Sequence, residues 1–245
     1  METSQKILAL DSSGLVASVA VVEGNSTYSN LLAEYTVNYK KTHSQTLLPM
    51  LDEIANMTEL DLTTIDAIAI AAGPGSFTGL RIGSATAKGL GLALKKPLIS
   101  IPTVDALAYN LYGTDRLICP IMDARRNQVY AAFYMWENGK LIRLTDHMAE
   151  SIERVIEIAE MLEHEVIFLG DGVPVHRERL EQNPAFLFAP AHCNMQRASA
   201  VAALGAIMAE EGLAKPGNAF ELIYLRKSQA EREREARLAK EEAGE

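Results

Sequence analysis

The hydrophobic positions in the N-terminal part of the chain predict an antiparallel meander followed by helices. Residues 6–10, 16–22 and 31–37 are β-branched or alternate between apolar and polar, and polar turns separate them. Apolar residues recur at helical spacing over 44–57, with Pro49 in the early turns. The continuous apolar run 65–71 predicts a strand buried on both faces. A glycine-rich turn, a helix to residue 94 and a short strand at 98–101 follow.

The same order of elements begins again in the second half of the chain. In both halves an aspartate, Asp11 or Asp123, ends the first strand, and the next strand begins six residues later. We therefore predict an internal duplication and an α/β fold with two similar lobes, each a mixed sheet flanked by helices. The predicted elements of the second half are helices at 103–112, 152–162, 175–180 and 195–210, and strands at 117–122, 129–136, 141–147, 166–169 and 186–188.

This pattern divides the chain into two lobes and a tail. Residues 1–103 form the first lobe and carry the helices expected to dimerise. Residues 104–226 form the second lobe, whose last helix could pack back on the first. Residues 227–245 are almost entirely Glu, Arg, Ala and Lys, which fits either a solvated helix or a disordered tail.

Composition narrows the class of protein. Hydrophobic residues make up 48% of the chain, enough for a buried core, and the net charge is −9 with 23 Lys and Arg. Because nucleic-acid binding needs clustered cations, we expect that this chain does not itself provide the main contacts to DNA or RNA. Two distant cysteines, Cys119 and Cys193, indicate no disulfide set. No apolar run reaches the ~20 residues of a membrane span, so we expect a cytoplasmic protein.

Two turns are candidates for binding an anion. Asp11 precedes a turn that, in actin-like and sugar-kinase-like ATPases, holds phosphates; here an Asx turn capped by Asp11 is the favoured alternative. The turn at 73–76 opens a helix but lacks the lysine of a P-loop. Arg125-Arg126 could bind a phosphate or a carboxylate of a partner. A solvent-exposed turn with no binding role explains these two residues equally well. The candidate nucleotide or anion contacts are Asp11, Ser12, Ser13, Gly75, Ser76 and Arg125.

The helix after residue 76 is rich in small residues. Its interior glycines at 83, 89 and 91 forgo roughly 3 kcal/mol of helix propensity, which close packing must offset. Two ridges at steps of four result, one at 79, 83, 87 and 91 and one at 85, 89 and 93. We predict that one ridge packs on the chain's own sheet and the other on a partner subunit. The residues assigned to the partner, with those of the preceding helix, are Leu47, Leu48, Leu51, Ile54, Gly79, Arg81, Gly83, Ala87 and Gly91.

The histidines predict no metal site. None has another histidine at i+3 or i+4, and no His-Glu-x-x-His helix is present. His43 precedes Ser44 at a helix start, but no acidic third member of a triad is evident.

Taken together, the motifs resemble the TsaB family, also called YeaZ. The matches run in order over roughly residues 6–226, and the run GPGSFTGLR at 73–81 is highly specific. The matching segments are ILALDSS at 7–13, HS at 43–44 with LLP at 47–49, GPGSFTGLRIG at 73–83, DARR at 123–126 with VY at 129–130, GDG at 170–172 and YLR at 224–226. The resemblance implies the actin/Hsp70-like ATPase (ASKHA) fold.

It also implies a function in tRNA modification. The family is the non-catalytic partner with which TsaD dimerises, so that TsaD can transfer threonylcarbamoyl to the adenosine beside the anticodon of tRNAs reading codons that begin with A. A small ATPase, TsaE, engages the pair. The resemblance implies a homodimer when the chain is alone, contact with tRNA only through the complex, and neither DNA nor membrane as a partner. ATP, Mg and a catalytic metal are expected on the partner subunits, with no cofactor on this chain.

The catalytic paralogue offers a test within the sequence. TsaD binds its metal with His-x-x-x-His after the strand that follows this helix, and the matching positions here are Thr103 and Leu107. Leucine cannot ligate a metal and threonine rarely does, so we expect no catalytic centre. The alternative is an actin-like ATPase or metal-dependent hydrolase in its own right. The older name of glycoprotease finds no support in the residues.

Overall fold

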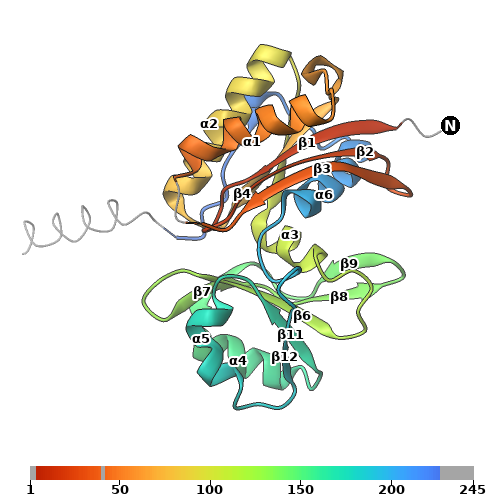
Figure 1. The fold of residues 1–245 in the computed structure, drawn as a ribbon. Coiled ribbons are helices and arrows are strands. Elements are labelled where there is room, and N and C mark those ends of the chain that lie inside the picture. Colours follow the sequence, from red (N-terminus) through yellow and green to blue (C-terminus); the bar gives the residue numbers. More distant parts are fainter. Residues whose placement is uncertain (1–3, 40–41, 227–245) are drawn as a thin grey trace, which may run out of the picture.

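The computed structural model describes residues 4–39 and 42–226, so the charged segment 227–245 lies outside the described residues. Two lobes, each built on a mixed sheet, stand one above the other in Figure 1. The first half contains β1 (Gln5–Asp11), β2 (Ala17–Gly24), β3 (Ser29–Val37), α1 (His43–Met57), the 3-10 helix η1 (Leu62–Thr64), β4 (Ala67–Gly73), α2 (Phe77–Leu94) and β5 (Leu98–Pro102). The second half contains α3 (Thr103–Tyr109), β6 (Leu117–Asp123), β7 (Gln128–Ala131), β8 (Tyr134–Glu137), β9 (Lys140–Arg143), β10 (Met148–Ser151), α4 (Ile152–Met161), β11 (Val166–Leu169), α5 (Val173–Leu180), β12 (Phe186–Phe188), α6 (Ala198–Glu210) and the 3-10 helix η2 (Gly217–Ala219).

The two sheets share one topology. The first has the order β3-β2-β1-β4-β5, and the second has the order β10-β7-β6-β11-β12, with β8 and β9 attached beside β6. In each, the first strand runs antiparallel to the second and parallel to the strand that follows the first crossover. This correspondence confirms the predicted fold class of two similar lobes, each with a mixed sheet.

Alternate side chains along the strands divide the core into layers. On β1, Leu8 and Leu10 face α1 and α2, whereas Ile7 and Ala9 face α6. In the second lobe one sheet face packs on α4 and α5, and the other packs on α3. The helices α3 and α6 therefore lie between the two sheets (Figure 1).

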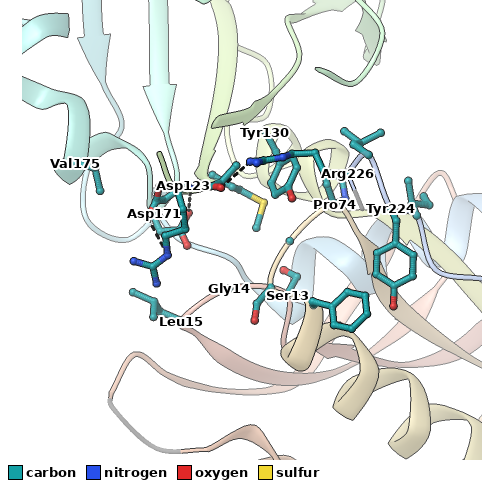
Figure 2. A pocket seen from close by; sticks show the side chains of 18 residues that line it. Ser13, Gly14, Leu15, Pro74, Asp123, Tyr130, Asp171, Val175, Tyr224 and Arg226 are labelled. Atoms are coloured by element: carbon teal, nitrogen blue, oxygen red, sulfur yellow. Dashed lines mark hydrogen bonds and ion pairs between the residues drawn. The ribbon is translucent and has the colours of Figure 1, made fainter. Parts of the chain in front are cut away.

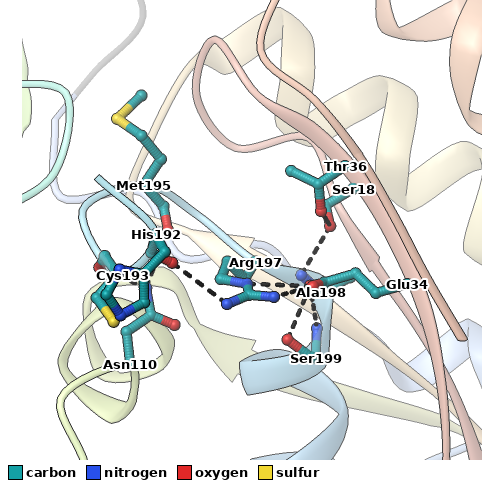
Figure 3. A network of polar contacts seen from close by, with 10 residues as sticks. All are labelled: Ser18, Glu34, Thr36, Asn110, His192, Cys193, Met195, Arg197, Ala198 and Ser199. Atoms are coloured by element: carbon teal, nitrogen blue, oxygen red, sulfur yellow. Dashed lines mark hydrogen bonds and ion pairs between the residues drawn. The ribbon is translucent and has the colours of Figure 1, made fainter. Parts of the chain in front are cut away.

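The last long helix returns to the first lobe. Small residues of α6 pack on small residues of the first sheet, and a Cβ added at Gly205 would lie 2.7 Å from the Cβ of Ala69. The side chain of Asn110 donates to the carbonyl oxygens of Cys193 at 3.1 Å and Met195 at 2.9 Å. These bonds hold the segment that leads into α6 (Figure 3).

The strand predicted at 129–136 is divided. Both parts pair with β6, but the outer neighbour of β7 is β10 and that of β8 is β9, so the outer partner changes at Ala132 and Phe133. The Phe133 carbonyl accepts from the Leu144 N–H at 2.7 Å, and the Phe133 N–H donates to the Thr145 hydroxyl at 3.1 Å. The prediction of one strand at 129–136 was therefore wrong, because apolar side chains continue across the break. The strand predicted at 141–147 ends at Arg143, and β10 was not predicted.

A polar network ties the edge strand β3 to the start of α6 (Figure 3). Glu34 accepts from Arg197 Nε at 3.1 Å, and from the Ser199 backbone N–H at 3.1 Å and hydroxyl at 2.7 Å. The Ser18 hydroxyl accepts from the Ala198 N–H at 2.9 Å. Burial would raise the pKa of Glu34, but the hydrogen bonds from Arg197 and Ser199 outweigh it and hold this pKa below its usual value.

We expect Glu34→Gln to lower the free energy of unfolding by about 1–2 kcal/mol at pH 7, because it leaves the Arg197 charge beside a neutral amide. The value is below that of a fully buried pair because the Arg197 side chain is 37% exposed. The folded pKa is depressed, so this stabilisation is present above about pH 4.3 and is lost as the pH falls through the folded pKa. Urea unfolding at several pH values measures it.

The matched control is Glu157→Gln, which removes the exposed pair Arg154–Glu157 on α4. Its effect should stay below about 0.5 kcal/mol. Equal effects of the two variants would contradict a structural role for the Glu34 network.

Candidate functional site in the cleft between the lobes

A cleft of about 510 Å³ opens where the two sheets meet (Figure 2). The duplication brings the carboxyl ends of β1 and β6, with the turns that follow them, to opposite walls of this cleft. The segment that ends the described chain closes a third side. The lining includes the candidate anion contacts and the charged and polar side chains around them: Ser13, Gly75, Ser76, Asp123, Arg125, Asp171, Tyr224 and Arg226.

Equivalent Asx turns form on both walls. Asp11 Oδ1 accepts from the Ser13 N–H at 2.9 Å and from its hydroxyl at 2.7 Å. Asp123 Oδ1 accepts from the Arg125 N–H at 2.8 Å. The Asx turn favoured for Asp11 is therefore present, and it uses both donors of Ser13 within the turn.

Three carboxyl groups belong to this region. Burial raises the pKa of Asp11 to about 6, against the opposing hydrogen bonds from Ser13, and Asp11 Oδ2 has no partner within the described chain. Burial likewise raises the pKa of Asp171 to about 6, and the negative charges of Asp123 and Asp11 add to this. Asp171 Oδ1 accepts from the Asp123 N–H at 3.1 Å. Such shifts are typical of functional sites, because a structure selected for stability alone would avoid them.

These residues do not fit a polyphosphate on their own. The Ser13 donors are already used, and the carboxylates would repel a phosphate. The nearby cations are Arg125, which is 83% exposed in its side chain and 3.7 Å from Asp123 Oδ2, and Arg226, which donates to the Ala124 carbonyl at 2.8 Å. Within residues 4–39 and 42–226, no three His, Cys, Asp or Glu side chains are arranged to hold a metal.

Of the six candidate anion contacts, four line the cleft and two are buried behind its lining. Ser13, Gly75, Ser76 and Arg125 belong to its lining. Asp11 and Ser12 are buried and are absent from the lining. Nucleotide or anion binding by these residues stays a prediction.

Asp171 was not assigned a role from the sequence, although the GDG motif was noted. The duplication was the signal that could have found it, because 170–172 after β11 corresponds to 73–75 after β4. Gly73 has φ +114° and Gly170 has φ +104°, and a Cβ at either would lie 2.3 Å from a backbone oxygen. The oxygen belongs to Ile223 in the first turn and to Ile121 in the second, but both turns begin with a glycine of positive φ. The second turn has Asp171 where the first has Pro74.

The ridge that begins at Gly79 packs against the turn after β1. A Cβ at Gly79 would lie 2.1 Å from the Ser12 carbonyl oxygen, and one at Gly83 would lie 2.3 Å from the Ser12 hydroxyl. That hydroxyl donates to the Gly79 carbonyl at 2.9 Å. The close approach predicted for this ridge exists, but it is made within the chain. The assignment of Gly79 and Gly83 to a partner subunit is corrected accordingly.

Most other residues assigned to a partner also face the chain's own core. Side chains buried in this way cannot offer surface to a second protein; these are Leu47, Leu51, Ile54 and Ala87, and Gly91 lies beside Leu98. Leu48, 52% exposed, and Arg81 remain at the surface, where Arg81 stacks on Phe77 at 3.9 Å from the ring centre. The ridge open to solvent is the second one, formed by Ala85, Gly89 and Ala93.

Comparison with known proteins places the chain in a family. The family model described as TsaD, tRNA N6-adenosine threonylcarbamoyltransferase, matches residues 30–233. A protein of Bacillus subtilis named tRNA threonylcarbamoyladenosine biosynthesis protein TsaB is 33% identical over 175 residues, which cover 71% of this chain and 75% of that protein. The chain belongs to the TsaB family.

Other members agree with this placement. The TsaB protein of Escherichia coli is 33% identical over 171 residues, covering 68% of this chain and 71% of that protein. A crystal structure from Pseudomonas aeruginosa, described as an uncharacterized protein with similarity to peptidase YEAZ, has a TM-score of 0.77 at 27% identity. The match covers 91% of this chain and 100% of that chain. The resemblance to TsaB (YeaZ) is therefore confirmed.

In this TsaB-family chain, the positions matched to the metal ligands of TsaD serve the fold. The Thr103 hydroxyl accepts from the Gly73 N–H at 3.2 Å, and Leu107 is buried in the core beneath the second sheet. Of the helices that are described, none has the length and apolar character needed to span a membrane.

Proposed function

We propose that this chain acts in the cytoplasm as a partner subunit in the synthesis of tRNA threonylcarbamoyladenosine, by dimerising with a TsaD-type catalytic subunit. The observation that supports this most is the outer surface of α1 and α2, which lie side by side over the first sheet (Figure 1). Leu48 on α1 is exposed, and on α2 the small residues Ala85 and Gly89 leave open space. Small and apolar side chains permit close helix–helix packing between subunits.

The proposal gives this chain no catalytic step. It works as a homodimer when alone and as a heterodimer with the TsaD-type protein, and a TsaE-type ATPase engages the pair. ATP, Mg and the catalytic metal belong to those partners, and tRNA is held by the complex. The net charge of −9 supports this division, since it disfavours direct binding of RNA.

We expect Leu48→Glu and Ala85→Glu each to weaken the subunit pair about 10–100-fold, because a buried unpaired carboxylate destabilises an interface. Both residues are exposed in this chain, so the variants should fold normally. Light scattering after size exclusion, on the chain alone and mixed with a TsaD-type protein, measures the mass of the pair.

Met161→Glu is the matched control, because Met161 is 75% exposed on α4 of the other lobe. It should leave the pair intact. If both α1 and α2 variants kept the mass of the pair and still supported tRNA modification, the proposed surface would be wrong.

The second candidate is an actin-like ATPase or metal-dependent hydrolase. Its support is the raised pKa values of Asp11 and Asp171, which are typical of a functional site, whereas the cleft residues by themselves do not fit a polyphosphate. Calorimetry of the isolated chain with ATP and Mg separates the two. Micromolar affinity followed by turnover would support the enzyme, whereas the partner subunit should show neither.

A further inference from the structure

A second groove, of about 810 Å³, lies between the C-terminal end of α2 and the segment around η2. Its rim carries Lys88, Lys95 and Lys96, and Leu92, Pro97 and Pro216 supply apolar surface. The cleft between the lobes meets the other end of α2, about 25 Å away along an 18-residue helix. The two sites are therefore separate.

The groove concentrates positive charge in an acidic protein. The described residues contain the lysines 6, 88, 95, 96, 140 and 215. Three of these six, at 88, 95 and 96, belong to the groove lining, and a fourth, Lys215, directly precedes Pro216 of the lining. None of those four forms an ion pair with a carboxylate in the described part of the chain. Their charges are available to an external anion.

Two further features of the α2 C-terminus, at Lys95 and Leu92, indicate a role beyond stabilisation of the helix. Lysines near a helix C-terminus interact favourably with the negative end of the helix dipole, and this accounts in part for Lys95 and Lys96. However, Lys95 caps α2 with φ +57°, a conformation in which glycine would be less strained. Leu92 is 83% exposed, the largest fraction among the exposed large hydrophobic side chains of the described residues. The dipole does not explain the exposed leucine.

We propose that this lysine groove binds an acidic peptide segment of a partner protein, with an apolar side chain of that segment against Leu92 and the prolines. Glutamate or aspartate side chains would meet the lysines at the rim. RNA fits less well, because the lining contains no arginine and no aromatic side chain on which a base could stack. The inference does not depend on the helix surface proposed for the TsaD-type subunit.

The test uses the full chain and a short fluorescein-labelled peptide rich in glutamate with a central leucine. Fluorescence anisotropy should show binding that weakens as salt is added. Lys95→Glu combined with Lys96→Glu should weaken it at least about tenfold, and Lys140→Glu, an exposed lysine of the other lobe, should leave it unchanged. Replacing the leucine of the peptide by alanine should also weaken binding roughly tenfold.

A second variant separates binding from folding. Lys95→Gly removes one charge and suits the positive φ, so it should be at least as thermally stable as the parent and still bind the peptide more weakly. In lysine acetylation followed by mass spectrometry, the peptide should protect Lys88, Lys95 and Lys96 but not Lys140. Absence of peptide binding, equal binding by the lysine variants, or tighter lysine-dependent binding of an RNA oligonucleotide would each overturn the proposal.

Discussion

Replacing Gly79 by alanine is expected to lower the free energy of unfolding by about 3 kcal/mol or more, because overpacking against backbone cannot relax by a rotamer change. The added Cβ would lie 2.1 Å from the Ser12 carbonyl oxygen. The surrounding backbone has little freedom to move, since the Ser12 hydroxyl donates to the Gly79 carbonyl and the Ser76 N–H donates to the Ser13 carbonyl at 2.7 Å.

Gly89→Ala on the same helix is the matched control, and it should have the opposite sign. No atom lies within 4 Å of a Cβ at Gly89, so alanine should stabilise the helix by about 1 kcal/mol through its higher propensity. Denaturant unfolding followed by circular dichroism measures both variants. A Gly79→Ala protein as stable as the parent, but unable to pair with its partner, would return this ridge to the subunit interface.

Asp11→Asn is expected to raise the free energy of unfolding by about 1–3 kcal/mol at pH 8, because each unit of pKa shift corresponds to about 1.4 kcal/mol. Asp11 has a folded pKa of about 6, above its ordinary value. The folded state therefore holds the proton more tightly, and ionisation destabilises it as the pH rises from about 4 through about 6. The gain from asparagine should be complete above that range and absent below it.

Asparagine also suits the local geometry. Its Oδ1 can accept the two bonds that Ser13 now donates to Asp11, and its neutral amide replaces a buried charge. Because the charge of Asp11 raises the pKa of Asp171, the variant should also lower that second pKa, which NMR titration can follow.

Asp61→Asn provides the control at an exposed turn of the same kind. Asp61 Oδ1 accepts from the Thr63 N–H at 2.9 Å, and hydrogen bonds from Thr63 lower the pKa of Asp61. Its stabilisation is therefore present at pH 8 and lost in acid, so asparagine should slightly destabilise the protein at pH 8. If Asp11→Asn behaved in the same way, burial would not control the Asp11 carboxyl.

A stability gain from Asp11→Asn would bear on function as well. A buried carboxyl that costs stability is expected where another molecule or a conformational change uses it. Loss of tRNA modification in this more stable variant would then assign the cleft a role in the complex.

Much of the fold was accessible from local sequence. Period-two and period-3.6 patterns located the strands of the first sheet and both outer helices, because burial of one face imposes those periods. The aspartates at 11 and 123 and the repeated order of elements revealed the duplication. The run at 73–81 indicated the family. Thr103 and Leu107, at the positions that the resemblance matches to the metal ligands of TsaD, predicted that this chain has no catalytic metal site of its own.

Other features depend on contacts between residues distant in sequence. Both ridges of α2 consist of small residues, so composition could not tell which one faces the Ser12 turn and which one faces solvent. The break at Ala132 arises because β7 and β8, which both pair with β6, have different outer neighbours, β10 and β9, although the apolar pattern continues through it. The raised pKa values of Asp11 and Asp171 arise from burial, to which the charges of Asp123 and, across the cleft, Asp11 add at Asp171. Periodicity records which face of an element is apolar, but only three-dimensional packing selects the neighbour of that face.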